Sequence, residues 1–337
     1  MTVRRGDDGG RSSVTKHRSR TSDSRAHTAL LLEVSRMYYE EELTQLEIAN
    51  RLLFSRTTVS RMLTEAKKRG IVHIRITHPM ERVLGLERSL VQLFGLKQAR
   101  VADSVDPLTT HLEVARGAAD LVVENSAEDT VITVSNGLAV TATVEALPQL
   151  AWPRSRVVQM IGSTGQSQWL LDSSETCRRM ARKLGGAFHP IPAPLVVGDP
   201  VTAAALKSDG QVATTLELGA RADLALTGIG AVTEGRSGLI LREHENDEVV
   251  RRLQQMGAVA HIAGYHLSQA GDLLDTDLTA RTIAVPPDRL REIPLVVGVA
   301  WGEAKVAAIA AVLRGGFISA LVTDLPTAVA LLNYTGN

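Results

Sequence analysis

The 337-residue sequence has little of several features that mark particular classes of protein. Its one cysteine, Cys177, excludes an internal disulfide and a cysteine-cluster metal site. The nine histidines are scattered without a convincing pair of metal ligands. Aromatic residues make up only 3% of the chain, which argues against base stacking on single-stranded nucleic acid. We therefore expect neither a bound metal nor a single-stranded nucleic acid partner.

Long apolar runs and nucleotide-binding motifs are also missing. No apolar run reaches membrane-spanning length, and the Arg-rich start is not followed by the apolar core of a signal peptide. Neither the spaced glycines of a dinucleotide site nor a P-loop Gly-Lys-Ser/Thr sequence occurs. The sequence therefore predicts a cytoplasmic protein with no membrane partner and no cofactor. With 44% hydrophobic residues, the chain is long enough for one small and one large domain.

Charge is balanced overall but divided unevenly along the chain. Residues 1–76 contain fifteen Lys and Arg against nine Asp and Glu, a formal charge of +6. Of the 37 basic and 37 acidic residues in the whole chain, this leaves 22 and 28, or −6, for the remainder. The asymmetry favours contact of the N-terminal segment with nucleic acid and argues against DNA contact by the acidic remainder.

The stretch from Leu43 to Ile76 has the pattern of a DNA-reading domain. Thr44, followed three residues later by Glu47, forms a capping box that should start a short helix. Ser55 is placed to cap a second helix after a brief turn. The inward faces of the two helices are expected to carry two sets of apolar residues: Leu46, Ile48, Ala49 and Leu52 on the first, and Val59, Met62, Leu63 and Ala66 on the second.

The remaining side chains of the second helix are donors that suit base edges and phosphates in a major groove. Lys67 and Lys68 close the helix and could touch phosphate, and Gly70 is a natural stop. The sequence of residues 71–76, rich in Ile and Val, predicts a short wing strand. The series favours a winged helix-turn-helix; the alternative is a small helical bundle with a solvated basic face. The donors that point outward are Arg56, Thr57, Thr58, Ser60, Arg61 and Thr64.

The turn between the two helices lacks the glycine that such turns often use for a left-handed residue. It reads Leu52-Leu53-Phe54-Ser55. Leucine in that geometry would cost about 1 kcal/mol.

The segments on either side of this domain are simpler. Residues 1–25 are polar and basic and should form a disordered tail, which either attracts phosphate non-specifically or has no function. A helix should run from Ala26 to the acidic Glu40-Glu41-Glu42 and complete a DNA-binding domain at residues 26–78. An apolar stripe between Val83 and Phe94 predicts a connector helix within residues 79–96. This helix either pairs between subunits or packs on the body.

Residues 97–337 alternate short β-rich runs with helical stretches, which predicts a doubly wound α/β domain with helices on both faces of a sheet. The expected strands are Ala99–Ala102, Thr130–Val134, Arg156–Met160, Leu224–Thr227, Ala258–Ile262, Leu295–Val299 and Ala320–Thr323. The expected helices include Thr109–Glu124, Leu138–Leu147, Ser174–Leu184, Asp247–Met256, Glu303–Leu313 and Pro326–Leu332.

Ligands of such sheets bind beyond the carboxyl ends of the strands, and three loops there could hold one. Ser135-Asn136-Gly137 precedes a helix that carries Thr141. Gly162-Ser163-Thr164-Gly165-Gln166 is small and flexible. Trp301-Gly302-Glu303 opens a helix with Lys305 in its first turn. Each loop alone is more often an ordinary turn, and a lone lysine is more often solvated than a ligand.

The segment from Thr44 to Ile76 is similar to the DNA-binding head of the SorC family of sugar-responsive bacterial transcription regulators. The resemblance extends to Leu226-Thr227-Gly228-Ile229-Gly230 and to the stretch from Ala300 to Asp324. It implies a body with the fold of sugar-phosphate isomerases, glucosamine-phosphate deaminases and CoA-transferases, used for binding rather than turnover. The matching head positions are Gln45, Ile48, Ala49, Leu52, Ser55, Val59, Ser60, Leu63, Ala66, Gly70, Ile71 and Val72.

The resemblance also implies partners and site residues. Operator DNA would be bound by Gln45 and Ser55 together with the outward donors and the two lysines of the second helix. A sugar, polyol or sugar phosphate would control DNA affinity, and the subunits would form a dimer or tetramer. Neither the sign of regulation nor the effector is implied. The expected effector positions are Asn136, Gly137, Thr141, Gly162, Gly165, Gln166 and Lys305.

The chain departs from the family pattern in its phosphate-binding loops. Ser135-Asn136-Gly137 stands where Gly-Trp-Gly is common, Trp301-Gly302 replaces Gly-Gly, and an arginine is absent between Gly162 and Gln168. These departures leave an unphosphorylated ligand open. An alternative is a sugar-phosphate enzyme with an appended DNA-binding head, for which Asp223, Glu303 or Asp324 could serve as a base. A dedicated enzyme has no need of the head, so a non-enzymatic regulator is favoured.

Overall fold

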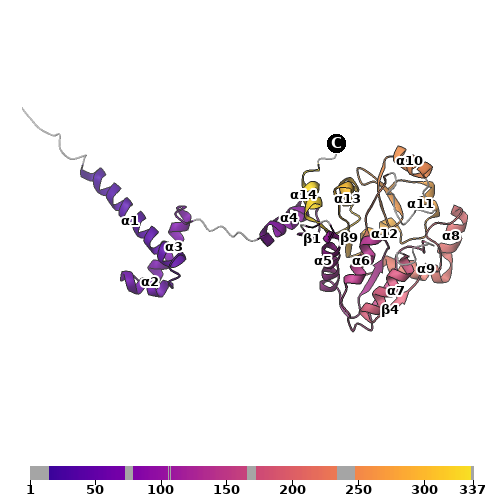
Figure 1. Cartoon of the computed structure of the whole chain (residues 1–337), viewed down its shortest axis with the longest axis horizontal. Helices are drawn as coiled ribbons and strands as arrows, with labels where there is room; N and C mark the ends of the chain where they lie inside the picture. The colour runs from indigo at the N-terminus through magenta and orange to yellow at the C-terminus, as the bar shows by residue number, and fades with distance from the viewer. Residues whose placement is uncertain are drawn as a thin grey trace, which may run out of the picture. The chain divides into compact units, whose positions relative to one another are not determined.

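The computed structural model describes residues 15–72, 79–104, 106, 108–164, 172–233 and 247–334. The chain divides into two compact units, which we call the head, Met1–Thr77, and the body, His78–Asn337 (Figure 1). This division lies next to the predicted boundary after residue 78. None of the described helices is both long enough and apolar enough to cross a membrane.

Three helices form the described part of the head: α1 (Thr15–Tyr39), α2 (Gln45–Leu52) and α3 (Arg56–Lys68). They pack around a small core to which α1 contributes Leu31, α2 Ile48 and α3 Val59. The four residues predicted as the buried stripe of α3 are all buried, which confirms that part of the pattern.

Two features of the head differ from expectation. Helix α1 begins eleven residues before the predicted start at Ala26, so a tail without regular structure was wrong for residues 15–25. No glycine or proline lies there, and extending an existing helix costs far less than starting one. Leu46 was expected in the core but is 57% exposed, because it lies about 200° around the helix from Ile48.

Two other predictions concern residues that are wholly or partly undescribed. Residues 1–14 of the expected tail and residues 73–76 of the expected wing strand lie outside the described residues. Ile71 and Val72, just before the latter, pack against the head core.

The body is built on a seven-stranded sheet in which every neighbouring pair is parallel. Six of the predicted strands lie in it, which confirms the parallel α/β class, and the short edge strand β4 was not predicted. The order is β1 (Gln98–Ala102), β10 (Ala320–Asp324), β9 (Leu295–Val299), β5 (Leu224–Gly228), β2 (Val131–Val134), β3 (Arg156–Gln159) and β4 (Ala187–His189).

The seventh predicted strand belongs to a second, antiparallel sheet of β6 (Gly230–Ala231), β7 (Ala258–Ile262) and β8 (Tyr265–Ser268). The reason is the connection that follows β7. Ala263 and Gly264 both have positive φ, at 49° and 86°, the combination that reverses a strand in a tight hairpin. A parallel neighbour would instead need a long crossover. Nothing in the apolar pattern of β7 distinguishes the two outcomes.

Helices cover both faces of the parallel sheet, because adjacent residues of each strand point to opposite sides. Ile132, Val157 and Val297 face a core shared with α5 (Thr110–Glu124), α6 (Leu138–Ala146) and α7 (Ser173–Leu184). Val131, Val158 and Val296 face a second core. That core includes residues of α4 (Pro79–Phe94), α9 (Gly210–Ala220), α13 (Val306–Arg314) and α14 (Leu325–Leu332).

The remaining described helical elements have at most nine residues each. They are α8 (Pro200–Ser208), α10 (Asp247–Gln255), α11 (Asp277–Arg281), α12 (Pro287–Glu292) and the 3-10 turn η2 (Glu303–Lys305). The predicted helix Glu303–Leu313 is therefore split into η2 and α13.

Strand order fixes where a ligand could enter the body. From β2 the chain adds β3 and β4 on one side, whereas β5, β9 and β10 extend the sheet on the other side. The order thus reverses between β2 and β5. In doubly wound sheets, ligands bind outside the carboxyl ends of the strands at such a reversal.

Candidate functional site

The start of α2 is fixed by a reciprocal cap. The Thr44 amide donates to Glu47 Oε2 over 2.8 Å, and the Glu47 amide donates to Thr44 Oγ1 over 3.3 Å. The side-chain hydrogen bond from Thr44, followed by the one from its backbone, lowers the pKa of Glu47. The predicted capping box is therefore confirmed.

The turn between α2 and α3 is made without glycine. Leu53 adopts the left-handed conformation, with φ 58° and ψ 37°, and its amide donates to the Ala49 carbonyl. Its side chain is 92% exposed, so no packing offsets the strain. Ser55 then caps α3 by accepting a hydrogen bond from the Thr58 amide over 3.1 Å, as predicted.

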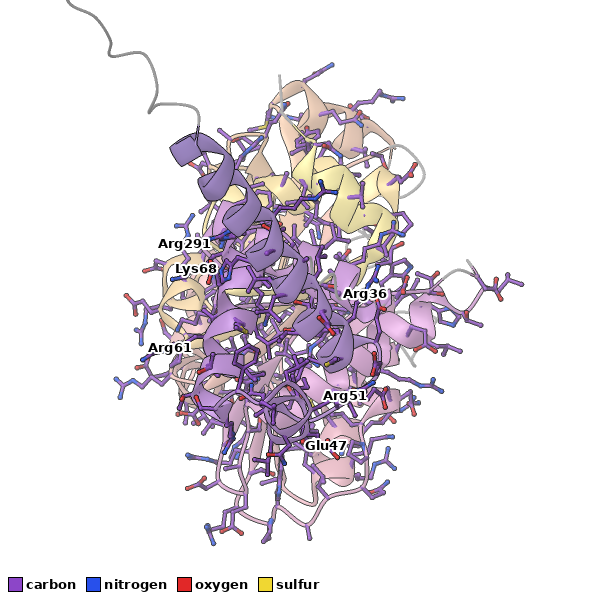
Figure 2. The ribbon with its side chains drawn as sticks, turned by 90° about the vertical axis from the view of Figure 1, so that its left-hand side faces the viewer. Arg36, Glu47, Arg51, Arg61, Lys68 and Arg291 are labelled. Atoms are coloured by element: carbon purple, nitrogen blue, oxygen red, sulfur yellow. The ribbon has the colours of Figure 1, made fainter. Side chains whose placement is uncertain are left out.

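The buried stripe of α3 determines which side chains point outward. Opposite that stripe lie Thr57, Arg61, Thr64 and Lys68, spaced by three or four residues along one face. Arg56, Ser60 and Lys67 flank this face. Figure 2 shows Arg61 and Lys68 on one side of the head and Glu47 and Arg51 of α2 on the other. Gln45, at the first position of α2, is half-buried.

Hydrogen bonds and ion pairs distinguish the polar side chains of α3. Within the part of the head that the structure describes, Arg56, Arg61 and Lys68 have no acidic partner. Ser55 Oγ lies 2.7 Å from both Thr57 Oγ1 and Thr58 Oγ1. Thr64 Oγ1 donates to the Ser60 carbonyl over 2.9 Å, and Lys67 Nζ lies 5.8 Å from the centroid of the Tyr39 ring. The side chains left available for an external anion are thus the two arginines and Lys68.

In the body, the loop after β2 lies at the reversal of strand order. The Ser135 amide donates to the Leu226 carbonyl over 3.0 Å, and Ser135 Oγ donates to Thr227 Oγ1 over 3.2 Å. These bonds hold the loop against the end of β5. Asn136 follows with only 2% exposure, and Gly137, at a φ of 110°, precedes the first residue of α6.

Lys305, in η2 after β9, also contacts the carboxyl end of β5. Its Nζ donates to the Ile229 carbonyl, just beyond β5, over 3.2 Å. A Cβ on Gly228 would stand 3.7 Å from the Asn136 carbonyl oxygen, so the two loops approach the end of β5 from either side. The Gly302 amide before η2 donates to Thr327 Oγ1 over 2.8 Å, which ties this loop to α14.

Asp324 is a third group at this edge, and the sequence did not place it in an effector site. It ends β10 and is 6% exposed. Its Oδ1 is buried without a hydrogen-bond partner among the described residues. We call Asn136, the backbone of Gly228 and Ile229, Lys305 and Asp324 the carboxyl-edge site.

The other two carboxylates that could serve an enzyme as a base, Asp223 and Glu303, are not part of the carboxyl-edge site. Asp223 is at the amino end of β5, where its Oδ2 accepts a hydrogen bond from the Val131 amide over 2.8 Å. It is therefore at the wrong edge of the sheet for a ligand in the carboxyl-edge site. Glu303 is exposed.

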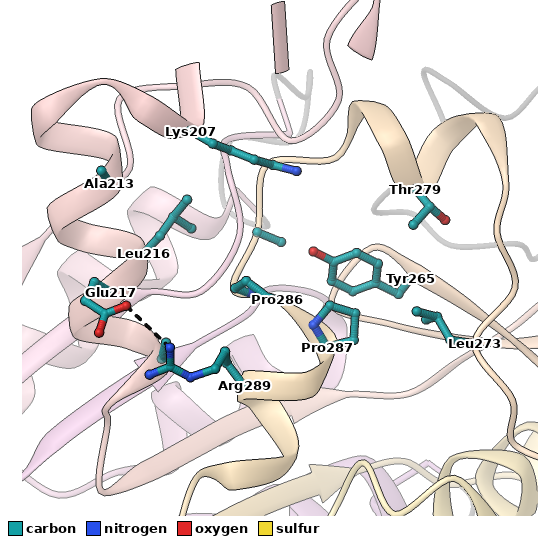
Figure 3. A pocket seen from close by; sticks show the side chains of 12 residues that line it. Lys207, Ala213, Leu216, Glu217, Tyr265, Leu273, Thr279, Pro286, Pro287 and Arg289 are labelled. Atoms are coloured by element: carbon teal, nitrogen blue, oxygen red, sulfur yellow. Dashed lines mark ion pairs between the residues drawn. The ribbon is translucent and has the colours of Figure 1, made fainter. Parts of the chain in front are cut away.

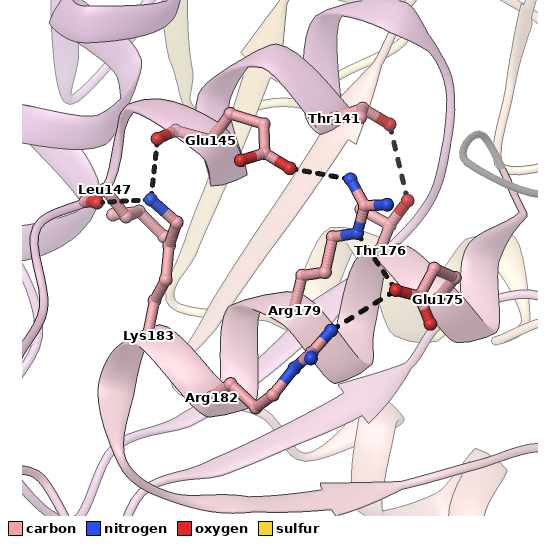
Figure 4. Close-up of polar contacts among 8 residues, drawn as sticks. All are labelled: Thr141, Glu145, Leu147, Glu175, Thr176, Arg179, Arg182 and Lys183. Atoms are coloured by element: carbon pink, nitrogen blue, oxygen red, sulfur yellow. Dashed lines mark hydrogen bonds and ion pairs between the residues drawn. The ribbon is translucent and has the colours of Figure 1, made fainter.

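Two of the remaining expected effector positions, Gly162 and Thr141, make contacts within the body. The Gly162 amide donates to the Ile283 carbonyl over 2.8 Å, and a Cβ there would meet the Pro194 backbone at 2.5 Å. The need for glycine is thus explained by packing. Thr141 Oγ1 lies 3.3 Å from Thr176 Oγ1 of α7, in the polar contacts between α6 and α7 (Figure 4). Gly165 and Gln166 lie outside the described residues.

Comparison with known proteins gives a consistent result. The Sugar-bind family model, which describes a sugar-binding domain, matches residues 78–333. The chain is 31% identical over 310 residues to the transcriptional regulator LsrR of Enterobacter sp. (strain 638), covering 91% of this chain and 94% of that protein. It is also 31% identical over 314 residues to the sorbitol operon regulator of Klebsiella pneumoniae, covering 90% and 97%.

A solved structure agrees with the sequence matches. The crystal structure of the full-length sorbitol operon regulator SorC from Klebsiella pneumoniae superposes with a TM-score of 0.73 at 30% identity. The match covers 90% of this chain and 99% of that one, and therefore includes most of the head as well as the body.

Proposed function

Because the chain belongs to the SorC family of sugar-binding transcriptional regulators, we propose that α3 reads operator DNA and that a carbohydrate at the carboxyl-edge site controls its affinity. The observation that carries the first half is the exposed face of α3, on which Arg56, Arg61 and Lys68 lack acidic partners among the described residues. No catalytic step is part of the proposal.

Helix α3 has the properties required of a recognition helix in a helix-turn-helix. The buried stripe anchors it on α1 and α2, and the left-handed Leu53 sets the short turn before it. Arg61 lies in the middle of the outward face, where bidentate contacts to guanine O6 and N7 distinguish bases. Lys68 lies at the end of that face and Gln45 at the start of α2, positions suited to phosphate. The predicted wing would add backbone contacts beyond Val72.

The carboxyl-edge site offers the groups that a carbohydrate needs. An asparagine amide both donates and accepts, a carboxylate accepts, and an ammonium donates, so Asn136, Asp324 and Lys305 together suit vicinal hydroxyls. Lys305 is also able to hold a phosphate, so a sugar, polyol or sugar phosphate fits the site. The buried Asp324 Oδ1, without a hydrogen bond among the described residues, supports a hydroxyl donor there.

Control of DNA affinity requires that the ligand favour one arrangement of subunits over another. In a dimer or tetramer, two copies of α3 would contact half-sites about one DNA turn apart. A ligand that links the loops after β2, β5 and β9 can shift the balance between arrangements that differ in this spacing. As a regulator acting on chromosomal DNA, the protein would work in the cytoplasm.

The experiment is a thermal-shift screen of the full-length protein against sugars, polyols and their phosphates, followed by operator titrations with any hit. A ligand that binds only the folded state raises the melting temperature. Lys305→Met should abolish the shift and the change in DNA affinity while leaving DNA affinity without ligand unchanged. Lys97→Met is the matched control, because Lys97 Nζ also donates to a backbone carbonyl, that of Pro294, but next to the amino end of β9. An undiminished ligand response in Lys305→Met would contradict the site.

A further inference from the structure

A second cavity lies in the body, away from the carboxyl-edge site. It has a volume of about 600 Å³, is partly open to solvent, and is lined by residues of α8, α9, β8, α11 and α12 and of the segment leading into α12 (Figure 3). None of its lining residues belongs to the carboxyl-edge site. Its size is within the range of small-molecule sites, roughly 300–1,000 Å³.

The lining of this cavity is apolar except at a few places. Leu216, Leu273 and the ring of Pro286 form much of the wall. Lys207 extends from α8 across the cavity, and the Tyr265 hydroxyl points into it toward the lysine ammonium (Figure 3). The cavity therefore combines an apolar body with two hydrogen-bond donors.

Neither donor has an acceptor among the residues that the structure describes. Tyr265 is 4% exposed, and its hydroxyl makes no hydrogen bond to any residue that the structure describes. Lys207 Nζ likewise has neither a hydrogen bond nor an ion pair within the described ranges. The carboxylate that lines the cavity, that of Glu217, is 3.6 Å from Arg289 Nη1 and also pairs with Arg221 (Figure 3).

The protonation states of these donors follow from their surroundings. Burial lowers the pKa of Lys207 from its usual value, since the half-buried ammonium loses water. Burial, and to a lesser extent the charge of Asp288, raises the pKa of Tyr265. The phenol is therefore a neutral donor at pH 7. An anion in the cavity would accept hydrogen bonds from both donors and would balance the charge of the lysine.

We propose that this cavity binds a small organic acid, with its carboxylate held by Lys207 and Tyr265 and its apolar portion against Leu216, Leu273 and Pro286. A carboxylate fits better than a phosphate, because Lys207 is the one lining cation without an acidic partner among the described residues, whereas Arg289 pairs with Glu217 and Glu292. A carbohydrate is a poor match, since the apolar walls leave most of its hydroxyls without partners.

The probe for this proposal is 4-fluorobenzoate, followed by its fluorine NMR signal in titrations of the full-length protein. Lys207→Met, which keeps the length of the side chain, should weaken binding about tenfold or more, as expected for loss of a hydrogen bond to a charged group. Tyr265→Phe, which removes only the hydroxyl, should weaken it several-fold. The neutral 4-fluorobenzamide and inorganic phosphate should bind far more weakly than the benzoate.

Other variants separate this site from the proposed regulatory site. Lys305→Met should bind 4-fluorobenzoate as the wild type does, and Lys207→Met should keep the full response to a carbohydrate. The proposal is overturned if Lys207→Met binds the benzoate as well as the wild type does, or if the benzamide binds equally. It is also overturned if no benzoate binding is seen at about 10 mM, beyond the range of specific sites.

Discussion

Helix α3 of the head and helix α7 of the body are both rich in basic residues, yet they use them differently. On α7, Arg179 pairs with Glu145 at 2.7 Å and Glu175 at 3.0 Å, and Arg182 reaches Glu175 at 3.3 Å. Lys183 donates to the carbonyls of Glu145 and Leu147 (Figure 4). On α3, by contrast, Arg56, Arg61 and Lys68 have no such partners among the described residues.

A count of basic residues therefore does not identify a nucleic-acid-binding helix. The cations of α7 link α6 to α7, and the contacts with Glu175 and Glu145 raise the pKa of Arg179. Arg179, Arg182 and Lys183 thus each have partners within the protein. The three cations of α3 named above have none among the described residues, so they remain available to an external polyanion. Four sets of substitutions test this contrast.

The largest effect is expected from replacing the central arginine of α3. Arg61→Ala should weaken operator binding by about 1–3 kcal/mol, since it removes a side chain placed to contact bases. The matched change on α7, Arg182→Ala, should leave operator affinity unaltered. Fluorescence anisotropy with labelled operator at fixed salt measures both. Equal losses in the two variants would mean that overall charge, and not the face of α3, governs binding.

The second-largest effect is expected in the salt dependence of operator binding, which should differ between variants of α3 and α7. Lys68→Ala should reduce the slope of log affinity against log salt by about one, because one phosphate contact is lost. Lys183→Ala should leave the slope unchanged and instead lower stability, since its ammonium bridges two backbone carbonyls. Titrations at several salt concentrations provide the slopes. A reduced slope for Lys183→Ala would place α7 on DNA and contradict the contrast.

The left-handed residues next to α3 and α7 should respond to substitution in opposite directions. Leu53→Gly removes the strain of φ 58° and should stabilise the head by up to about 1 kcal/mol, less the entropy that glycine adds to the unfolded chain. Gly185→Ala, at φ 78° after α7, should destabilise the body by about 1 kcal/mol. Denaturant unfolding measures both. Destabilisation by Leu53→Gly would show that the leucine side chain has a role at the turn.

The smallest effect concerns pH. The folded-state pKa of Glu47 is lowered by its hydrogen bonds with Thr44, so its stabilising contribution is present above the unfolded-state pKa and is lost as pH falls through the folded value. Glu47→Gln should therefore be less stable than the wild type at pH 7, and the two should converge at acidic pH. Melting curves across this range test the linkage. A constant difference at all pH values would exclude a role for the carboxylate charge.

Local features of this protein could be predicted from the sequence because they depend on neighbouring residues. The cap formed by Thr44 and Glu47, the cap formed by Ser55 and the buried stripe of α3 follow from hydrogen bonds and spacings within one or two helical turns. The parallel strands follow from continuous apolar runs that are buried on both faces. The missing glycine of the turn could be read from the sequence, but only the structure shows that Leu53 takes the left-handed conformation there.

Features that depend on distant residues were decided by the tertiary structure. Strand order brings Asn136, the end of β5 and Lys305 together. Gly162, by contrast, packs closely against the Pro194 backbone, and Thr141 contacts Thr176 of α7. Which cations of a basic helix stay free depends on acids far along the chain. The donors of Lys207 and Tyr265 share one cavity only because the fold places α8 and β8 along the same cavity. The periodicity of a helix or strand indicates on which face of that element a residue lies, but not which distant residue it contacts. It therefore carries no information about these tertiary contacts.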